Sequence, residues 1–192
     1  MTLTSAQLPT LIVVSGFPAT GKSSLGRRLA NHFMLPFMGK DMAKELLCEI
    51  LGCEDLTQSQ LIGRASMRLL YQFAENILRV RQSCIIESVF YPQFAIPDLK
   101  VLRERYPYQP LEIFCVAEQT ILEERWQRRS NSGERHPGHM EQARNIPFPP
   151  KEEQVRPLVH GAPSIVHDTS NFATIDYEAL IARVQTYLDT TL

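Results

Sequence analysis

The sequence predicts an α/β fold in which helices cover both faces of a central parallel sheet. Its 192 residues alternate between short apolar segments, typical of buried strands, and longer segments with helical periodicity. The apolar segments are continuous and do not alternate with polar residues, as expected for strands that are covered on both faces. Strands and helices that alternate at these lengths indicate successive βαβ units and therefore parallel strand pairing.

The first strand and the first helix have the clearest patterns. Residues 10–15 (TLIVVS) are apolar and largely β-branched, which predicts a buried strand. Residues 23–34 follow as a helix, because Leu25, Leu29 and Phe33 fall on one face at helical spacing.

A short strand and two helices come next. Residues 35–38 are a possible second strand, and residues 41–51 are a predicted helix with Asp41 near its start. A longer helix is predicted over residues 58–81. Its apolar stripe at helical spacing consists of Leu70, Phe73, Ala74, Ile77 and Leu78.

Two further strand and helix pairs follow along the chain. Residues 84–90 (CIIESVF) predict a buried strand, and residues 98–106 a helix that Pro107 ends. Residues 111–117 (LEIFCVA) predict another strand, followed by a helix over residues 120–129.

The composition then changes. Residues 130–157 are rich in proline, glycine and charge and poor in large apolar residues, which predicts an irregular segment. Residues 164–167 form the last predicted strand and residues 176–188 the last helix. We expect one domain over residues 1–192, with residues 130–157 as an inserted lid.

One motif carries the chemistry. Residues 16–23 (GFPATGKS) match the P-loop pattern G-x-x-x-x-G-K-[ST], between a predicted strand and a predicted helix. The glycines let backbone amides converge on one point, and the helix N-terminus favours an anion there. Lys22 can reach the β- and γ-phosphates of ATP, and the Ser23 hydroxyl can coordinate Mg²⁺. The candidate ATP-binding residues here are Gly16, Pro18, Ala19, Thr20, Gly21, Lys22, Ser23 and Ser24.

A P-loop alone does not separate kinases from GTPases or motor ATPases. The sequence has no N-K-x-D motif, which a GTPase uses to recognise guanine. It also lacks the apolar-Asp-Glu strand of motor ATPases; the nearest equivalent, residues 85–87 (IIE), has one acidic residue. These differences favour a kinase.

Residues 16–24, with Pro18 inside the loop, resemble the small P-loop kinases of the AAA-domain or zeta-toxin-like group. That group is similar to gluconate and shikimate kinases, chloramphenicol phosphotransferase and the kinase domain of polynucleotide kinases. The resemblance covers nearly the whole chain in the order of its elements. It implies a three-layer P-loop NTPase fold with about five parallel strands in the order 2-3-1-4-5. It also implies an ATP-dependent kinase that phosphorylates a hydroxyl of a small-molecule acceptor.

The resemblance also implies acceptor-site residues. In the stretch GKDMAK over residues 39–44, Asp41 matches an aspartate that orients the acceptor hydroxyl or takes its proton, and Lys44 matches a basic residue beside it. Asp41 could instead be only a helix N-cap. Glu87, at a strand end, would contact the acceptor or hold Mg²⁺ through water. Many relatives have Asp at this position, and a strand-end carboxylate could also cap a loop.

Arginines near the expected lid are the next candidates. In small P-loop kinases, lid arginines neutralise the charge of the phosphoryl group in transfer. Arg129 and Arg135 are catalytic candidates, together with Lys22 and Asp41, and Arg125 is a candidate for ATP binding. The alternative is a solvated helix whose arginines pair with neighbouring glutamates.

Two loops have weaker assignments. Thr169 and Asn171 follow the last strand, where related kinases pass the adenine, although such residues also favour ordinary turns. His136 and His139 suggest a metal site, but no third ligand has the spacing of a zinc site. A polar contact with the acceptor or a solvated loop accounts for them better.

Composition restricts the partners. With 20 Lys and Arg against 21 Asp and Glu, the net charge of −1 disfavours a nucleic-acid partner. A polynucleotide 5′-hydroxyl kinase stays an alternative, since Arg64, Arg68, Arg79 and Arg81 could cluster on one helix. A non-catalytic ATP-binding module is the other alternative.

Localisation follows from simple features. No apolar stretch is long enough to cross a membrane, and residues 1–10 show no secretory pattern. The four cysteines form no C-x-x-C pair, which is typical of reduced thiols in a cytoplasmic protein. The acceptor's identity and the oligomeric state are not predicted.

Overall fold

The computed structural model describes residues 8–133 and 135–191. The prediction that residues 1–10 have no secretory pattern therefore lies mostly outside the described residues. Its centre is a five-stranded parallel sheet in the order β2-β3-β1-β4-β5, which confirms the predicted fold class and strand order. The strands are β1 (Thr10–Gly16), β2 (Phe37–Gly39), β3 (Cys84–Ser88), β4 (Gln109–Val116) and β5 (Ser164–Asp168).

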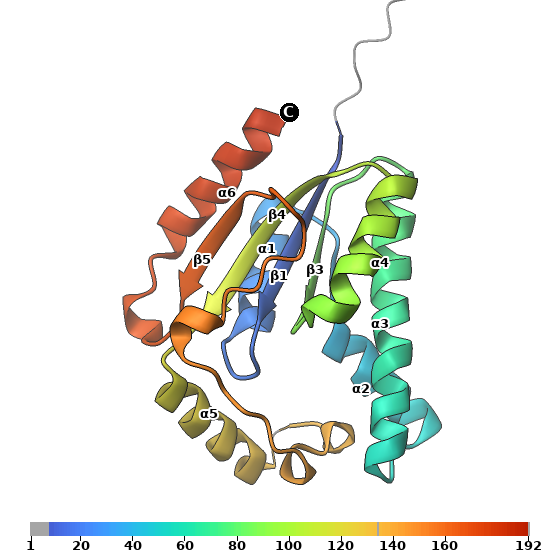
Figure 1. The fold of residues 1–192 in the computed structure, drawn as a ribbon, viewed down its shortest axis with the longest axis vertical. Coiled ribbons are helices and arrows are strands. Elements are labelled where there is room, and N and C mark those ends of the chain that lie inside the picture. The colour runs from blue at the N-terminus through green and yellow to red at the C-terminus, as the bar shows by residue number, and fades with distance from the viewer. Residues whose placement is uncertain (1–7, 134, 192) are drawn as a thin grey trace, which may run out of the picture.

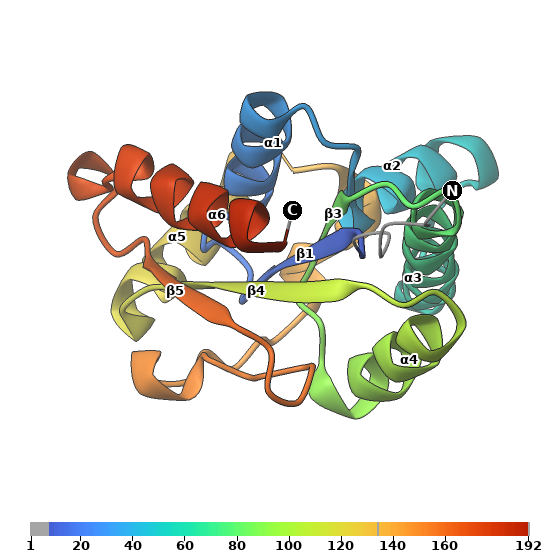
Figure 2. The same ribbon diagram turned by 90° about the horizontal axis from the view of Figure 1, so that it is seen from above.

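Helices cover both faces of the sheet (Figure 1). They are α1 (Lys22–Phe33), α2 (Lys40–Leu51), α3 (Leu56–Arg79), α4 (Pro92–Arg105), α5 (Gln119–Ser132) and α6 (Tyr177–Thr191). Seen from above, α1 and α6 lie on one side of the sheet and α4 on the other (Figure 2). No helix of the described chain is long and apolar enough to span a membrane.

Residues of β1 alternate between two apolar cores. Leu11 and Val13 pack with residues of α3 and α4, whereas Ile12 and Val14 pack with residues of α1 and α6. All four side chains are fully buried, because side chains on a strand point alternately to its two faces and helices cover both. The continuous apolar run in the sequence therefore reflects burial on two sides.

Helix α4 begins earlier than predicted. The sequence predicted a start at residue 98, but the helix begins at Pro92 and contains Pro97. Pro92 occupies the first turn, where backbone N–H groups have no acceptor within the helix, so the N–H that proline lacks costs no hydrogen bond. Pro97 removes one interior hydrogen bond, and the burial of Ala95 and Leu99 against the core outweighs that cost.

The α5–β5 segment, residues 133–163, passes over the carboxyl end of the sheet (Figure 1). In the described part of this segment, regular structure is limited to the 3₁₀ turns η1 (Pro137–His139), η2 (Glu141–Ala143) and η3 (Lys151–Glu153). Two buried side chains attach its far end to the sheet. Gln154 donates to and accepts from the backbone of Ala117, just after β4. Glu112 Oε1 accepts hydrogen bonds from the amides of Leu158 and Val159 at 2.9 and 3.0 Å.

We expect Glu112→Ala to destabilise the protein by about 2 kcal/mol or more, because it leaves two backbone amides without their acceptor. Urea unfolding measures the change. Glu112→Gln is the matched control: its amide oxygen still accepts, so its loss should be smaller. An alanine variant as stable as the wild type would show that the attachment contributes nothing.

Candidate active site

The P-loop joins β1 to α1 at the carboxyl end of the central strand. A Cβ atom on Gly16 would lie 2.6 Å from the Cys115 carbonyl oxygen of β4, so only glycine fits this close approach. The buried Thr20 hydroxyl donates to the Phe17 carbonyl oxygen at 2.8 Å and closes the loop on itself. Gly21 then enters α1 in the left-handed conformation, with φ of 78°. The loop is thus held in place by the chain itself.

Three side chains converge below this loop. Glu87, at the end of β3, accepts a hydrogen bond from Ser23 Oγ through Oε2 at 2.8 Å. Its other oxygen, Oε1, lies 3.7 Å from Lys22 Nζ. Burial raises the pKa of Glu87, while Lys22 and the Ser23 hydrogen bond act in the opposite direction. The Ser23 hydroxyl and the Glu87 carboxylate are oxygen donors of the type that Mg²⁺ prefers, so the residues present fit this ion.

Asp41 faces the same cluster from the first turn of α2. The N-cap of α2 is Gly39, and no side chain caps the helix, so capping does not explain Asp41. Burial would raise the pKa of Asp41, but Lys40, Lys22 and Arg135 together outweigh it and hold the pKa well below its usual range. Asp41 is therefore a carboxylate at neutral pH, and it is a weak base.

The three predicted arginines lead to three different places. Arg135, from the α5–β5 segment, forms an ion pair with Asp41 and another with Glu45, at 3.0 Å. Arg129 is paired with the buried Glu141, with 2.6 Å between Nη2 and Oε1. Arg125 lies over the Phe172 ring, 3.9 Å from its centroid, and donates to the Thr169 and Ser170 carbonyl oxygens.

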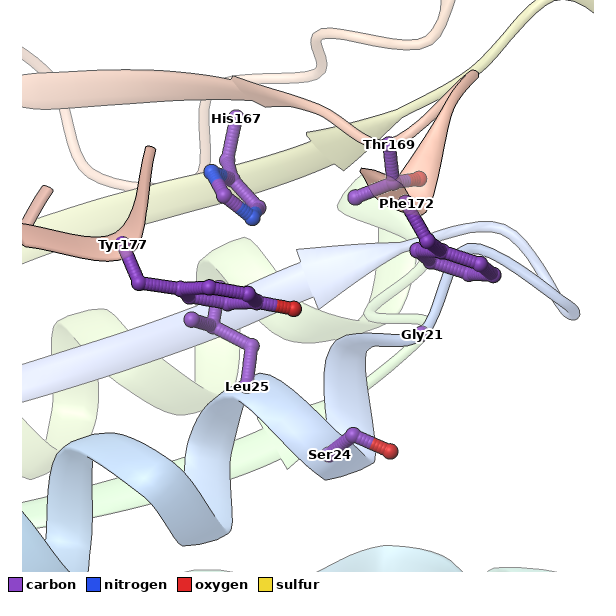
Figure 3. A pocket seen from close by; sticks show the side chains of 7 residues that line it. All are labelled: Gly21, Ser24, Leu25, His167, Thr169, Phe172 and Tyr177. Carbon is purple, nitrogen blue, oxygen red and sulfur yellow. The ribbon is translucent and has the colours of Figure 1, made fainter. Parts of the chain in front are cut away.

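A pocket of about 230 Å³ opens beside the P-loop, between α1 and the end of β5 (Figure 3). Ser24 lies on its α1 side, and the Phe172 ring stands next to Gly21. The rings of His167 and Tyr177 close the opposite end, 5.9 Å apart. Burial lowers the pKa of His167 and keeps its imidazole neutral. The pocket is therefore partly aromatic, uncharged and adjacent to the helix N-terminus. Its lining residues are Gly21, Ser24, Leu25, His167, Thr169, Phe172 and Tyr177.

One of the solved structures similar to this chain is close enough in sequence to show its family. No family model matches the sequence, and no curated protein does either. A solved structure described as a "putative kinase" from Chloroflexus aurantiacus J-10-fl is 34% identical, with a TM-score of 0.85. The match covers 94% of this chain and 98% of that chain. This chain belongs to the small P-loop kinases.

More distant structures share the fold of this P-loop kinase. A gluconokinase from Sinorhizobium meliloti 1021 is 20% identical over 96% of this chain and 98% of that chain, with a TM-score of 0.53. The APS kinase of Mycobacterium tuberculosis, solved with AMPPNP and APS, is 12% identical over 95% and 99%, with a TM-score of 0.57. In both cases the structural similarity extends over almost the whole chain.

Several predicted site residues have partners within the protein. Asn171 caps the 3₁₀ turn η4 (Phe172–Thr174), with its Oδ1 accepting from the Ala173 amide at 3.0 Å, as the turn interpretation expected. Lys44 is buried, and its Nζ donates to Ser59 Oγ at 2.7 Å. Arg125 contacts Phe172 and Arg129 pairs with Glu141, and their roles toward ATP stay predictions.

The sequence analysis missed the aromatic residues of the pocket. Tyr177 falls within the last predicted helix, residues 176–188, and Phe172 was not singled out. The available indication was a phenylalanine in the polar turn sequence directly after the last predicted strand, and the structure leaves this ring half-exposed. His167 gave no indication, because a histidine in a short strand is more often structural.

We expect Gly21→Ala to cost more stability than Gly133→Ala. Both glycines have similar left-handed conformations, with φ of 78° and 72°, so alanine adds about 1 kcal/mol of strain at each. A Cβ at position 21 would also lie 3.1 Å from the Phe172 ring, whereas nothing lies within 4 Å at position 133. Urea unfolding compares the two variants. Equal losses would show that Phe172 moves aside at no cost.

Proposed function

We propose that this P-loop kinase transfers the γ-phosphoryl group of ATP to a hydroxyl of a small-molecule acceptor. The observation that carries the proposal is the convergence of Lys22, Ser23 and Glu87 on one point that Asp41 faces from another helix. The first three residues suit a nucleotide phosphate and its metal ion, and the fourth suits an acceptor hydroxyl. A site that only binds ATP has no need of the fourth.

The nucleotide is proposed to occupy the P-loop and the adjoining pocket. Backbone amides of the loop and the N-terminus of α1 would hold the phosphates, with Lys22 beside them. The base would lie near Phe172 and Thr169, where Arg125 Nη1 is buried and has no hydrogen-bond partner among the described residues. Ser23 and Glu87 would hold Mg²⁺, which, when bound, neutralises charge on the phosphates.

The transfer step asks little of Asp41 as a base. The acceptor oxygen forms a bond to the γ-phosphorus, the bond from that phosphorus to the β,γ-bridging oxygen breaks, and ADP leaves. Asp41 accepts a hydrogen bond from the attacking hydroxyl and aims its oxygen; the proton passes to Asp41 as the new bond forms. A carboxylate with a low pKa suits this role, because in a loose transition state the orientation of the attacking hydroxyl matters more than the strength of the base.

The α5–β5 segment is proposed to act as the lid of a single domain. Arg135 already reaches the active site from this segment, through its ion pair with Asp41. When ATP is bound, Arg135 would turn from Asp41 toward the γ-phosphate, and the segment would exclude water from the reaction. Arg129, held by Glu141, would anchor the segment to α5.

A transfer assay tests the proposal directly. The protein is incubated with Mg·ATP and a pooled set of metabolite and antibiotic alcohols, and mass spectrometry detects any compound that gains one phosphoryl group. Lys22→Ala is the control. A phosphorylated product that is absent with the control confirms the kinase and identifies its acceptor. ATP binding without any product would favour the non-catalytic module or an untested acceptor such as a nucleic-acid end.

Asp41→Asn should lower the transfer rate by about a hundredfold or more, because the amide cannot accept the proton and aims the hydroxyl poorly. The affinity for ATP should stay within about twofold of the wild type, because Asp41 contacts the acceptor and not the nucleotide. Steady-state kinetics and calorimetry measure the two quantities. Asp98→Asn, at a partly exposed position on α4, is the matched control. An unchanged transfer rate in Asp41→Asn would exclude the assigned role.

A further inference from the structure

Two cations share one neutral partner where α2, α3 and the α5–β5 segment meet. Lys44 Nζ on α2 donates to Ser59 Oγ on α3 at 2.7 Å, and Arg144 Nη2 donates to the same oxygen at 3.2 Å. The Ser59 hydroxyl in turn donates to the Gly138 carbonyl oxygen at 2.7 Å. Lys44 is only 1% exposed and Arg144 is half-buried, so the lysine charge lies away from bulk water.

This cluster has too little negative charge. Among the described residues, no carboxylate oxygen lies within 4.0 Å of the Lys44 or the Arg144 side chain. Arg144 Nε is also buried and has no hydrogen-bond partner. Proteins rarely bury a lysine without an anion beside it, because removing its charge from water costs several kcal/mol. The cluster is therefore incomplete as it stands.

The nearby acidic residues are already used by other cations. Asp41 and Glu45 pair with Arg135, and Glu45 also lies 2.9 Å from His139 Nε2. Glu141 pairs with Arg129. These acids form their close ion pairs with other cations, and Asp41, which interacts with Lys44 at longer range, does not outweigh the burial of Lys44. A closer anion has to come from outside the described chain.

The protonation of Lys44 agrees with a missing anion. Burial, together with the charges of Lys40 and Arg144, lowers the pKa of Lys44 to about 8, although Cys48 and Asp41 act in the opposite direction. An anion beside it would raise this pKa again. The charged and titratable groups that face Lys44 or interact with it are Lys40, Asp41, Cys48, His139 and Arg144.

The location connects the cluster to the acceptor. Lys44 follows Asp41 by three residues on α2, so the two side chains lie on one side of the helix, with about 5–6 Å between their Cβ atoms. A small molecule with its hydroxyl at Asp41 can therefore place a second group at Lys44. Arg144 and Gly138 belong to the α5–β5 segment, which would lift to admit this group and then close on it.

We propose that Lys44 and Arg144 bind an anionic group of the acceptor, a carboxylate or a phosphate, while Asp41 holds its hydroxyl. The inference rests on the proposed kinase function and narrows it to acceptors that are anionic alcohols. In the complex, the oxyanion takes the place of the Ser59 hydroxyl as the partner that the two cations share.

Binding of inorganic phosphate tests the cation pair without any transfer. The P-loop is first saturated with Mg·AMPPNP, so that added phosphate does not bind there, and calorimetry follows a phosphate titration. We expect Lys44→Met to weaken phosphate binding roughly a hundredfold, because it removes half of the paired charge. Lys100→Met, at an exposed position on α4, should bind phosphate as the wild type does. Equal phosphate affinity in Lys44→Met and the wild type would overturn the proposal.

Thermal unfolding separates this role from a structural one. If Lys44 serves only to join α2 to α3, Lys44→Met should lower the melting temperature. If Lys44 awaits an anion, replacing a buried unpaired charge by an apolar side chain of similar length should leave the melting temperature unchanged or raise it. A clear fall in melting temperature together with normal phosphate binding would assign Lys44 to structure alone.

Proton uptake gives a pH-dependent test. Above pH 8 the free protein has lost much of the Lys44 proton, and phosphate binding should restore it. Calorimetry at pH 8.5 in two buffers of different ionisation enthalpy should therefore detect proton uptake in the wild type and not in Lys44→Met. The phosphate affinity should fall as the pH rises above 8. Equal uptake in both proteins would contradict the assignment.

Matched acceptors distinguish this inference from the proposed function. A sugar alcohol, the sugar acid and the sugar phosphate of the same carbon chain are each assayed with Mg·ATP. We expect transfer to the acid or the phosphate, and a KM for that compound raised at least tenfold in Lys44→Met. Transfer to the neutral alcohol at an equal rate in both proteins would overturn the anion site and leave the kinase standing. Phosphate binding without transfer to any compound would count against the kinase function only.

Discussion

The parallel pairing of β3 with β1 is the contact on which the rest of this structure depends. It sets Glu87 beside Val14, two residues before the P-loop begins at Gly16. It also lets β2 add to the other side of β3, with Gly39 opposite Glu87. The carboxylate thereby reaches both Lys22 and Ser23, and α2 begins directly next to it.

This arrangement explains why charged side chains gather at one end of an apolar sheet. Parallel strands end at the same edge, so the residues that follow β1, β2 and β3 meet there although they are far apart in the chain. The α5–β5 segment adds Arg135 from above. Because the site is partly buried, each charge requires a partner, and Arg129 and Arg135 pair with Glu141 and Asp41. Lys44 and Arg144 share only the hydroxyl of Ser59, which is why we propose that an anion binds there.

The nucleotide side is built in a different way. Its pocket contains two aromatic rings and a neutral imidazole, and the nearby charged groups, Lys22 of the P-loop and Arg125 over Phe172, lie outside the pocket lining. An apolar, partly aromatic pocket next to a helix N-terminus suits a ligand that has a flat ring at one end and phosphates at the other. The two halves of the site thus differ in the same way as the two substrates proposed for them.

Most helices and strands and the P-loop could be predicted from local sequence patterns. Burial on both faces makes β1 continuously apolar, and the glycines at positions 16 and 21 are required by close approach and by a left-handed backbone, so both features are visible locally. Asp41 and Glu87 were predicted from the resemblance to small P-loop kinases, and the structure places Asp41 just after β2 and Glu87 near the end of β3. The start of α4 was not, since packing of Ala95 and Leu99 overrides the local effect of Pro97.

The pairing of the charged side chains is visible only in the folded protein. Arg125, Arg129 and Arg135 look alike in the sequence, yet they meet Phe172, Glu141 and Asp41. Their partners come from segments that are distant in the chain, and spacing along one helix gives no information about them. The lack of an acid beside Lys44 is likewise a property of three segments packed together, because a missing partner is defined only once every neighbour is known.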